Sequence, residues 1–333
     1  MKTKTVKAVK MIDPRSKKTL RAIDLFSGAG GFTEGARQAG INVVWAANHW
    51  GQAVQVHKNN HPTTDHVIQD LRQADFTKVP DVDLILASPC CHGHSKARGT
   101  DKPQHDSSRA TAFAVFEAAC VKLPKFIVVE NVLEFRNWGT RVRKGIFYER
   151  WVANFEDLGY IVEENVLDAS EFGVPQERKR LFLTMVQSDV SEDPITIRSP
   201  KLPPIPASTI IDWNGKHNWR LHCGLKPKTQ QRIAVGRIYH KGPFLVAYYG
   251  AARGGRSVDR PLGTVTTKDR YGLVDGPWFR MLNIQEYRKA MGFPDNYLLP
   301  KTHKTALKML GNAVCPAVAS HVIKTVKKLA GAA

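Results

Sequence analysis

Cys90 stands where a nucleophilic cysteine could act. It lies in the segment LILASPCCHGHS, directly after an apolar run and Pro89, so it follows a buried strand at the mouth of an expected cleft. A thiolate is the attacking species in cysteine chemistry, and basic neighbours in a loop at a strand end favour it. The segment therefore predicts either a catalytic thiol or, as the plainer alternative, a structural cysteine.

A metal site is the other alternative for this segment, with Cys90, Cys91, His92 and His94 as ligands. Adjacent cysteines cannot easily turn both sulfurs toward one tetrahedral ion. No second Cys/His pair lies at zinc-finger spacing elsewhere in the chain. We therefore expect no metal.

Two further segments place charged side chains at strand ends. FIVVENV ends with Glu130 and Asn131, and a carboxylate facing the same cleft as Cys90 could bind and help protonate a ring nitrogen. In PQERKRLFL, Gln176, Arg178 and Arg180 lie just before or at the start of another strand. Strand alternation sends Arg178 and Arg180 the same way, and Arg180 could donate to a base carbonyl.

A glycine-rich turn, DLFSGAGGF, joins a predicted strand to a helix. Gly28, Gly30 and Gly31 allow a sharp turn and a close approach of the backbone to a ligand. The turn suits dinucleotides and S-adenosylmethionine alike. A nicotinamide-dependent oxidoreductase fits this turn but leaves Cys90 unexplained.

The next two strands end at Asn48-His49-Trp50 and at Asp70. In a doubly wound sheet these ends lie beside the first glycine-rich turn, so Trp50 could stack on an adenine and Asp70 could accept a hydrogen bond from its exocyclic amine. The alternative is a buried tryptophan and a helix-capping aspartate.

Apolar runs alternate with helical patterns from residue 22 to about 186. Strand-like runs such as AIDLF, VVWAA, LILA, FIVV and RLFLTMV are separated by amphipathic stretches such as ATAFAVFEAACVKL and IFYERWVANFEDLG. This pattern predicts an α/β fold with a doubly wound, mostly parallel sheet, in which ligands bind beyond the carboxyl ends of the strands.

The remainder of the chain divides into three predicted parts. Residues 1–20 are a basic segment that is either a flexible tail or a DNA-contacting arm. Residues 187–281 open with prolines and then mix basic and aromatic side chains, which indicates a smaller, irregular domain. From Leu282 the helical pattern returns, so 21–186 and 282–333 are predicted to form one discontinuous domain.

The overall charge points to a polyanionic partner. The 333 residues carry 49 Lys and Arg against 30 Asp and Glu, a formal net charge of +19. Such an excess gains affinity by releasing counterions from phosphates, so nucleic acid is expected, and an anionic membrane less so. Five scattered cysteines, the lack of a long apolar span and the lack of a signal-peptide core predict reduced thiols and a cytoplasmic protein.

Taken in order, these motifs resemble the cytosine-C5 DNA methyltransferases of bacteria and phages. DLFSGAGGF resembles the family's first motif, SPCC its nucleophile motif, ENV its glutamate motif, QERKR its Gln-x-Arg-x-Arg motif and LGNAVCP its last. RPLGTVTTKDR resembles the motif that closes the target-recognition region, and the match spans roughly residues 22 to 325. Six ordered motifs are far more specific than any one of them.

The resemblance implies that Cys90 attacks C6 of a flipped cytosine, which makes C5 nucleophilic toward the methyl group of S-adenosylmethionine. Glu130 would hold N3 and the 4-amino group, Arg180 the O2, and Asn131 the nucleophile loop, with Arg178 in the same catalytic set. The donor contacts implied are Phe26, Gly28, Gly30, Asn48, Trp50, Asp70, Leu71, Asn312 and Val314. Residues 187–281 become the target-recognition domain, with DNA contacts from Gln176, Arg232, Arg237 and Thr266.

Two positions depart from the family pattern. Cys91 stands where the family has Gln, and Asn48 where it has a Glu that binds the donor's ribose hydroxyls. Two alternatives therefore accompany the DNA enzyme: a tRNA cytosine-C5 methyltransferase, and a catalytically impaired methylase-like DNA-binding protein. For the enzyme we expect duplex DNA as the partner, a monomeric state and the possibility of a separate restriction endonuclease.

Overall fold

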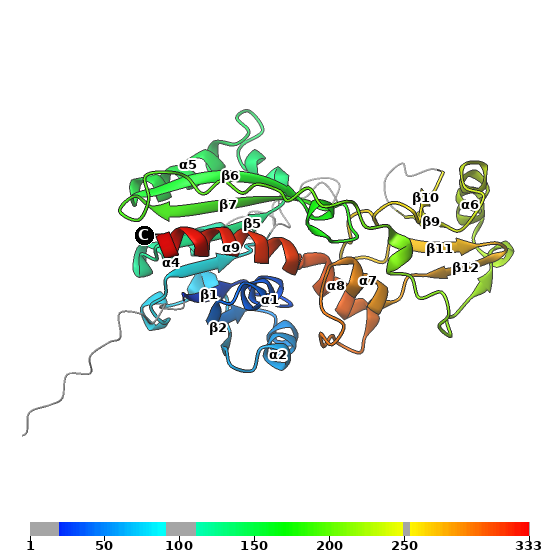
Figure 1. Ribbon diagram of the computed structural model, residues 1–333, viewed down its shortest axis with the longest axis horizontal. Helices are drawn as coiled ribbons and strands as arrows, with labels where there is room; N and C mark the ends of the chain where they lie inside the picture. Colours follow the sequence, from blue (N-terminus) through cyan, green and yellow to red (C-terminus); the bar gives the residue numbers. More distant parts are fainter. Residues whose placement is uncertain (1–19, 91–110, 249–253, 333) are drawn as a thin grey trace, which may run out of the picture.

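The larger sheet of the computed structural model has seven strands and carries the candidate site. The structure describes residues 20–90, 111–248 and 254–332. The strands stand in the order β3-β2-β1-β4-β5-β7-β6 (Figure 1). Their bounds are β1 (Arg21–Leu25), β2 (Asn42–Asn48), β3 (Asp65–Ile68), β4 (Leu84–Ala87), β5 (Phe126–Asn131), β6 (Tyr160–Asp168) and β7 (Lys179–Gln187).

The directions of these strands confirm the predicted doubly wound, mostly parallel sheet. β1 pairs in parallel with β2 and β4, and the parallel pairing continues to β3 on one side and to β5 on the other. β7 runs antiparallel to both β5 and β6. The strand order reverses between β1 and β4, and a ligand crevice is expected beyond the carboxyl ends at such a switch point.

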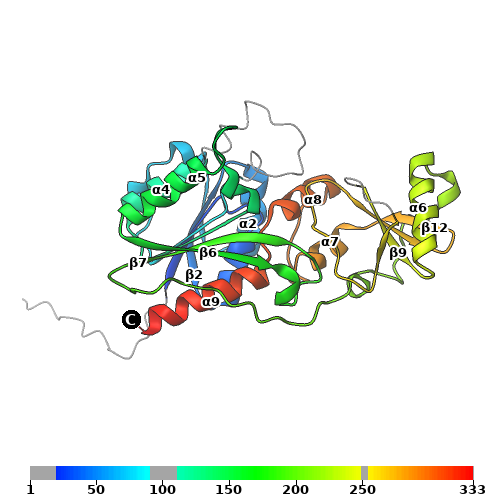
Figure 2. The ribbon, with the colours of Figure 1, turned by 90° about the horizontal axis from the view of Figure 1, so that it is seen from above.

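Helices cover both faces of this sheet. α1 (Gly31–Gln38), α2 (Gly51–Asn60) and α9 (Pro316–Ala332) lie on one face, and α4 (Thr111–Lys122) and α5 (Ile146–Asp157) on the other (Figure 2). Each face has its own apolar core. The stretch His303–Gly331 is long and apolar enough to cross a membrane, but 78% of its apolar window is buried, as in a core helix of this fold.

A second sheet of five short antiparallel strands lies in residues 220–281, in the order β10-β9-β11-β12-β8. Its strands are β8 (Arg220–Leu221), β9 (Phe244–Ala247), β10 (Arg256–Ser257), β11 (Tyr271–Asp275) and β12 (Trp278–Met281). α6 (Pro227–Tyr239) packs on it at the end farthest from the larger sheet (Figures 1 and 2). The sequence pattern predicts an irregular domain here. It misses these strands because strands of two to five residues are too short to show hydrophobic alternation.

Two helices stand between the sheets, α7 (Ile284–Ala290) and α8 (His303–Asn312) (Figure 1). Within the described residues the remaining elements are short 3-10 helices: η1 (Leu71–Gln73), η2 (Phe76–Lys78), η4 (Leu133–Asn137), η5 (Ala169–Phe172), η6 (Ala207–Thr209) and η7 (His222–Gly224). The division into a discontinuous domain and an inserted one stays a prediction, and the two sheets are compatible with it.

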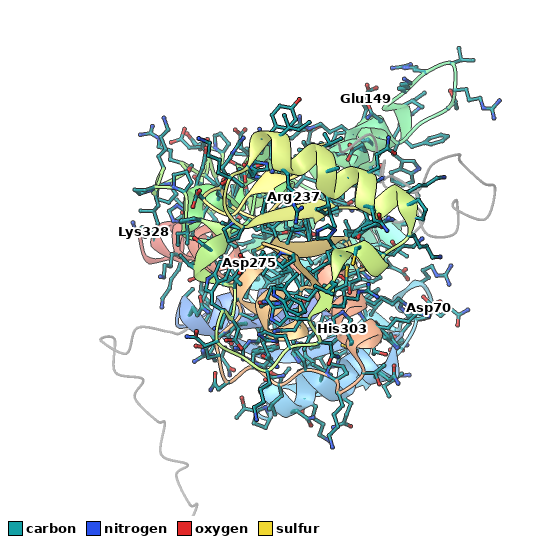
Figure 3. The ribbon with its side chains drawn as sticks, turned by 90° about the vertical axis from the view of Figure 1, so that its right-hand side faces the viewer. Asp70, Glu149, Arg237, Asp275, His303 and Lys328 are labelled. Atoms are coloured by element: carbon teal, nitrogen blue, oxygen red, sulfur yellow. The ribbon has the colours of Figure 1, made fainter. Side chains whose placement is uncertain are left out.

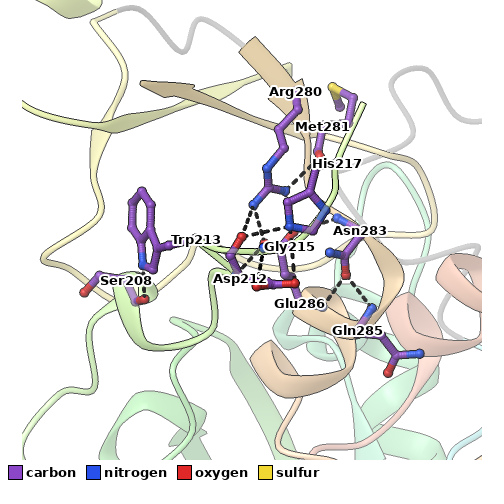
Figure 4. Close-up of polar contacts among 10 residues, drawn as sticks. All are labelled: Ser208, Asp212, Trp213, Gly215, His217, Arg280, Met281, Asn283, Gln285 and Glu286. Carbon is purple, nitrogen blue, oxygen red and sulfur yellow. Dashed lines mark hydrogen bonds and ion pairs between the residues drawn. The ribbon is translucent and has the colours of Figure 1, made fainter. Parts of the chain in front are cut away.

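A buried ion pair fastens the small sheet to α7. The guanidinium of Arg280, on β12, donates to both carboxylate oxygens of Glu286, at 2.8 and 2.6 Å, and the two side chains are 2% and 1% exposed (Figure 4). Glu286 also accepts from the backbone N–H groups of Asp212 and Asn283. The carboxylate thus joins three segments of chain at one point.

Replacing Glu286 should therefore destabilise the protein strongly. Glu286→Ala leaves the Arg280 charge buried and uncompensated, which costs about 3–5 kcal/mol of unfolding free energy. Chemical denaturation followed by circular dichroism measures the loss. The exposed pair Arg143–Glu149, 68% and 60% exposed, provides the control: Glu149→Ala should change stability by no more than about 1 kcal/mol. Equal effects of the two variants would contradict this account.

Candidate active site

A cavity of about 440 Å³ opens at the carboxyl ends of β1, β2, β4 and β5. This volume is within the range of small-molecule sites. Both predicted groups of residues face it. The cavity is lined by Phe26, Gly28, Asn48, Trp50, Asp70, Leu71 and Asn312 of the predicted donor set, and by Cys90, Glu130, Arg178 and Arg180 of the predicted catalytic set.

The loop that carries Cys90 is held from two sides. The backbone N–H of Cys90 donates to Oγ1 of Thr111, at the start of α4, at 3.0 Å. Nδ2 of Asn131, at the end of β5, donates to the carbonyl of Pro89 at 3.3 Å, and its Oδ1 accepts from the N–H of Val132. Asn131 itself does not line the cavity. It fixes the backbone just before the half-buried Cys90, whose thiol is free.

Glu130 and Arg180 form an ion pair on the cavity wall. Nε of Arg180 lies 3.2 Å from Oε1 of Glu130, and the side chains are 17% and 8% exposed. Burial raises the pKa of the Glu130 carboxyl above its ordinary value, and the positive charges of Arg180 and Arg178 oppose that shift. The carboxyl group therefore holds a proton more readily than an exposed glutamate does.

Arg178 has a different environment from Arg180. Its Nη1 donates to the carbonyl of Val265, and its Nη2 to the carbonyls of Gly311 and Ala313, each at 3.0 Å. These bonds tie the entry to β7 to two distant segments of the chain. Arg178 also lines the cavity, and a guanidinium bonded to three backbone carbonyls is suited to a positioning role. Its place in the catalytic set stays a prediction.

The glycine-rich turn forms the floor of the donor side. Gly28 has φ +54°, and a Cβ at this position would meet only the carbonyl of Phe26, at 3.8 Å, so the turn leaves open space above it. Gly30, with φ +87°, is packed instead: a Cβ there would lie 2.5 Å from the hydroxyl of Tyr297. Neither Gly30 nor Val314 lines the cavity. Gly30 thus supports the turn from behind, and the predicted contact of Gly30 and Val314 with a ligand stays a prediction.

Aromatic and polar groups form the opposite wall. Trp50 is half-buried, and Nζ of Lys308 lies 4.5 Å from the centre of its ring. Oδ1 of Asn48 accepts from the backbone N–H of Trp50 at 2.9 Å, so the amide NH₂ of Asn48 is the group left to serve as a donor. The predicted stacking surface and the predicted hydroxyl-binding residue are thus neighbours in one cavity.

Asp70 lines the cavity and also caps η1, so its capping role is observed while its contact with a ligand stays a prediction. Its Oδ1 accepts from the backbone N–H of Arg72 at 3.1 Å, and the Arg72 guanidinium pairs with both of its carboxylate oxygens. These hydrogen bonds lower the pKa of Asp70 to about 2. The carboxylate is therefore a fixed, ionised acceptor at neutral pH.

Comparison with known proteins decides the family. A model of the C-5 cytosine-specific DNA methylase family matches residues 20–328. The chain belongs to this family.

Relatives of the methylase match along most of its length. It is 27% identical over 299 residues to the Type II methyltransferase M.HgiDI of Herpetosiphon aurantiacus, covering 89% of this chain and 90% of that protein. It is 28% identical over 301 residues to the Type II methyltransferase M.HindV of Haemophilus influenzae, covering 89% and 92%.

Solved structures share the fold of the methylase. A putative DNA modification methyltransferase encoded within a prophage of E. coli superposes with a TM-score of 0.68 at 20% identity, covering 94% of this chain and 100% of that one. A mutant of DNMT2 from Spodoptera frugiperda gives 0.67 at 20% identity, covering 93% and 100%. These likenesses confirm the methyltransferase-type α/β architecture.

Each residue predicted to contact DNA has hydrogen-bond partners within the protein. Gln176 is fully buried; its side chain donates to the carbonyl of Ala290 and accepts from the N–H of Val265, so the structure favours a packing role for it, and its contact with DNA stays a prediction. Thr266 bonds the carbonyl of Lys268 at 3.0 Å beside the close approach of Gly311. Its contact with DNA stays a prediction.

Arg232 and Arg237 are both on α6. Arg232 bonds the carbonyl of Ala247 and lies over the ring of Tyr248, and Arg237 bonds the carbonyl of Gly276 at 2.6 Å. Both guanidinium groups thus fasten α6 to its own sheet, and this helix lies at the end of the molecule farthest from the larger sheet (Figure 1). The structure favours a packing role over a contact near the target base.

Some site residues carried no motif signal. Thr111, Arg72 and Lys308 line the cavity, although nothing in their local sequence marks them. Thr111 lies 21 residues after Cys90. Only the fold could have linked each of them to the site.

Cys91, His92 and His94 lie outside the described residues, as does the basic segment 1–19. The metal-site alternative for these side chains, and the departure from the family pattern at Cys91, thus fall outside the described residues. Among the residues that the structure does describe, no group of three or more His, Cys, Asp or Glu side chains is arranged to hold a metal ion.

Buried histidines lie beneath the glycine-rich turn of the methylase. Nδ1 of His57 is 2.7 Å from Nε2 of His66, and its Nε2 is 3.0 Å from Oγ1 of Thr33, which donates to Asp24. Nε2 of His61 is 3.1 Å from the hydroxyl of Tyr297, and this hydroxyl also bonds the carbonyl of Ala29 in the turn. The turn thus depends on histidine and tyrosine side chains from two segments.

This network should make stability depend on pH. Burial and the nearby His57 lower the pKa of His61 to about 3 and that of His66 to about 4, whereas histidine in an unfolded chain titrates near 6.5. The unfolded state therefore binds more protons as pH falls from 6.5 toward 4, and the free energy of unfolding decreases over that window. Denaturant titrations at several pH values measure the slope.

The matched variants are His61→Gln, which should flatten this pH dependence, and His49→Gln, which alters an exposed histidine outside the network. A slope that is the same in wild type and in His61→Gln would show that His61 does not carry the effect.

Proposed function

We propose that this methylase transfers a methyl group from S-adenosylmethionine to C5 of a cytosine flipped out of duplex DNA. The observation that carries the proposal is the shared cavity: a free thiol, a buried carboxyl group and a guanidinium from β4, β5 and β7 face the same space as the glycine-rich turn. A binding protein without catalysis has no need to bring these three groups together.

The donor side fits S-adenosylmethionine in the chemistry of its residues. Gly28 leaves room for a ligand above the turn, Trp50 offers an aromatic face for adenine, and the ionised Asp70 offers an acceptor for an exocyclic amine. Asn48 can donate to a ribose hydroxyl through its NH₂ group, so the loss of the usual Glu leaves a hydrogen bond in place. The donor supplies an electrophilic methyl group when bound.

The thiolate of Cys90 attacks C6 of the extruded cytosine. The hydrogen bonds from Asn131 and to Thr111 hold the nucleophile's backbone, so little motion is needed at that step. The attack adds electron density at C5, the position to be alkylated. Loss of the C5 proton and elimination of the sulfur then release Cys90 in its original state.

Glu130 and Arg180 make the ring susceptible to that attack. A protonated Glu130 carboxyl donates to N3 and draws electrons from C6, while Arg180 donates to O2. Arg180 also offsets the charge when Glu130 gives up its proton. The two side chains therefore act as one unit, with Arg178 holding the strand that carries Arg180.

Duplex DNA is the proposed partner. The net charge of +19 suits a polyphosphate, and a paired cytosine must leave the stack before its C6 can meet a thiol at the bottom of a cavity. Residues 187–281 are proposed as the target-recognition domain. We further propose a cytoplasmic, monomeric enzyme that acts beside a separate restriction endonuclease, as the Type II names of its relatives suggest.

Covalent trapping tests the nucleophile. Duplex DNA containing 5-fluorocytosine cannot lose a proton from C5, so wild-type protein with S-adenosylmethionine should accumulate a stable protein–DNA adduct. Cys90→Ser should give none, measured as a shifted band on denaturing gels. An adduct that persists in Cys90→Ser would refute the assignment, and equal activity on tRNA would refute the choice of duplex DNA.

Replacing Glu130 tests whether its carboxyl group gives a proton to the cytosine ring. The raised pKa of Glu130 keeps its acid form present to a higher pH than in an ordinary carboxyl group, so kcat should fall as pH rises through that pKa. Glu130→Gln retains a donor but cannot transfer a proton, and should lower kcat by about 10²- to 10⁴-fold and remove this alkaline limb. A Glu130→Gln enzyme with the wild-type pH profile would contradict the role.

A further inference from the structure

A basic hairpin projects from the methylase between η4 and α5. The backbone N–H of Thr140 donates to the carbonyl of Arg143 at 3.0 Å, and the N–H of Arg143 donates to Oγ1 of Thr140 at 2.9 Å. These bonds close a tight turn with Arg141 and Val142 at its tip. The turn rises above α5 in Figure 1 and extends beyond Glu149 in Figure 3.

The charged side chains of the hairpin are all basic. From residue 135 to residue 148 the chain contains no acidic residue, and Arg141, Arg143 and Lys144 are all exposed at the tip. Arg143 lies 3.2 Å from Glu149, so Arg141 and Lys144 carry most of the uncompensated charge. Between them the apolar side chain of Val142 is 98% exposed.

An aromatic cluster with two exposed rings lies between the hairpin and the active site. Thr111, which lines the cavity and holds the Cys90 backbone, is followed in α4 by Phe113, which is 46% exposed. The ring of Phe113 lies 5.4 Å from that of Trp138, and Trp138 lies 6.1 Å from Phe147, which is 44% exposed. The carbonyl of Trp138 also accepts the N–H of Phe147. The exposed rings of Phe113 and Phe147 therefore pack on either side of the buried Trp138, between the cavity-lining Thr111 and the hairpin.

We propose that residues 139–145, with the exposed rings of Phe113 and Phe147, form a DNA-contacting surface on the catalytic domain, which we call the hairpin surface. This surface would contact the duplex beside the flipped cytosine. The proposal rests on the proposed function for the identity of the partner as duplex DNA. It adds a contact site outside the region assigned to target recognition.

The chemistry of the surface selects this partner. Arg141 and Lys144 gain affinity for phosphates by releasing counterions, and exposed apolar and aromatic side chains pack against sugars and bases where the stack has been opened. Opened stacking is expected next to a cavity that takes in an extruded base. An acidic protein partner would satisfy the cations, but it would not explain why the surface adjoins the cavity.

Salt dependence of binding tests the cations. Full-length Arg141→Ala/Lys144→Ala is titrated with a fluorescein-labelled duplex of mixed sequence at several salt concentrations. Loss of two phosphate contacts should reduce the slope of log K against log salt by about 1.8. The control is Lys324→Ala/Lys328→Ala, which removes two exposed cations from α9; Lys328 lies on the opposite side of the molecule from the hairpin in Figure 3. A slope unchanged in the hairpin variant, or changed equally in the control, overturns the proposal.

A second variant tests the apolar tip. Val142→Asp should weaken duplex binding several-fold and leave the thermal unfolding midpoint unchanged, because the side chain touches little of the folded protein. Wild-type affinity in Val142→Asp would remove the tip from the surface. If the hairpin variants weaken binding to tRNA and leave duplex binding intact, the surface serves RNA and the proposal fails.

Methyl incorporation from labelled donor separates this proposal from the proposed function. If the wild-type protein methylates duplex DNA and the hairpin variants bind it with the wild-type salt dependence, the hairpin surface is refuted and the proposed function stands. If the wild-type protein binds duplex DNA through the hairpin but incorporates no methyl group, the proposed function is refuted and the hairpin surface stands.

Discussion

The reversed direction of β7 is the constraint on which the rest of the site depends. Because β7 runs antiparallel to β5, its amino end lies against the carboxyl end of β5, where Glu130 faces Phe182 across the ladder. Arg180 lies two residues before Phe182 and so projects to the same face as Glu130. A parallel strand in this place would have put its first residues at the opposite edge of the sheet. The carboxyl group would then be buried without a counter-charge, at a cost of several kcal/mol.

The catalytic side of the site was predictable because its residues follow strongly apolar strands. Cys90 and Glu130 each come directly after a buried run, and in a mostly parallel sheet such positions meet at one edge. The glycine-rich turn was visible for the same reason. Strand alternation also paired Arg180 with Arg178 correctly in direction. The sheet, the ordered motifs and the family were thus all accessible from the sequence.

What the sequence could not show was which side chains of one motif are held by distant parts of the backbone. Gln176 and Arg178 stand in the same motif as Arg180, but their partners are at residues 265, 290, 311 and 313. No local pattern reports such distant acceptors. For the same reason Thr111 and Lys308 could not be predicted as site residues. The small sheet was not predicted because its strands are too short to show a hydrophobic alternation.

The carbonyl groups that receive Arg178 have a consequence for how the pocket is held in shape. Gly311 and Ala313 lie just before α9, and this helix fills one face of the main core with Val318, Val322, Ile323 and Val326. The cavity wall that begins β7 is therefore anchored to backbone 133 and 135 residues away along the chain. Loosening the packing of α9 would loosen that wall as well, so the shape of the pocket and the integrity of the core are coupled.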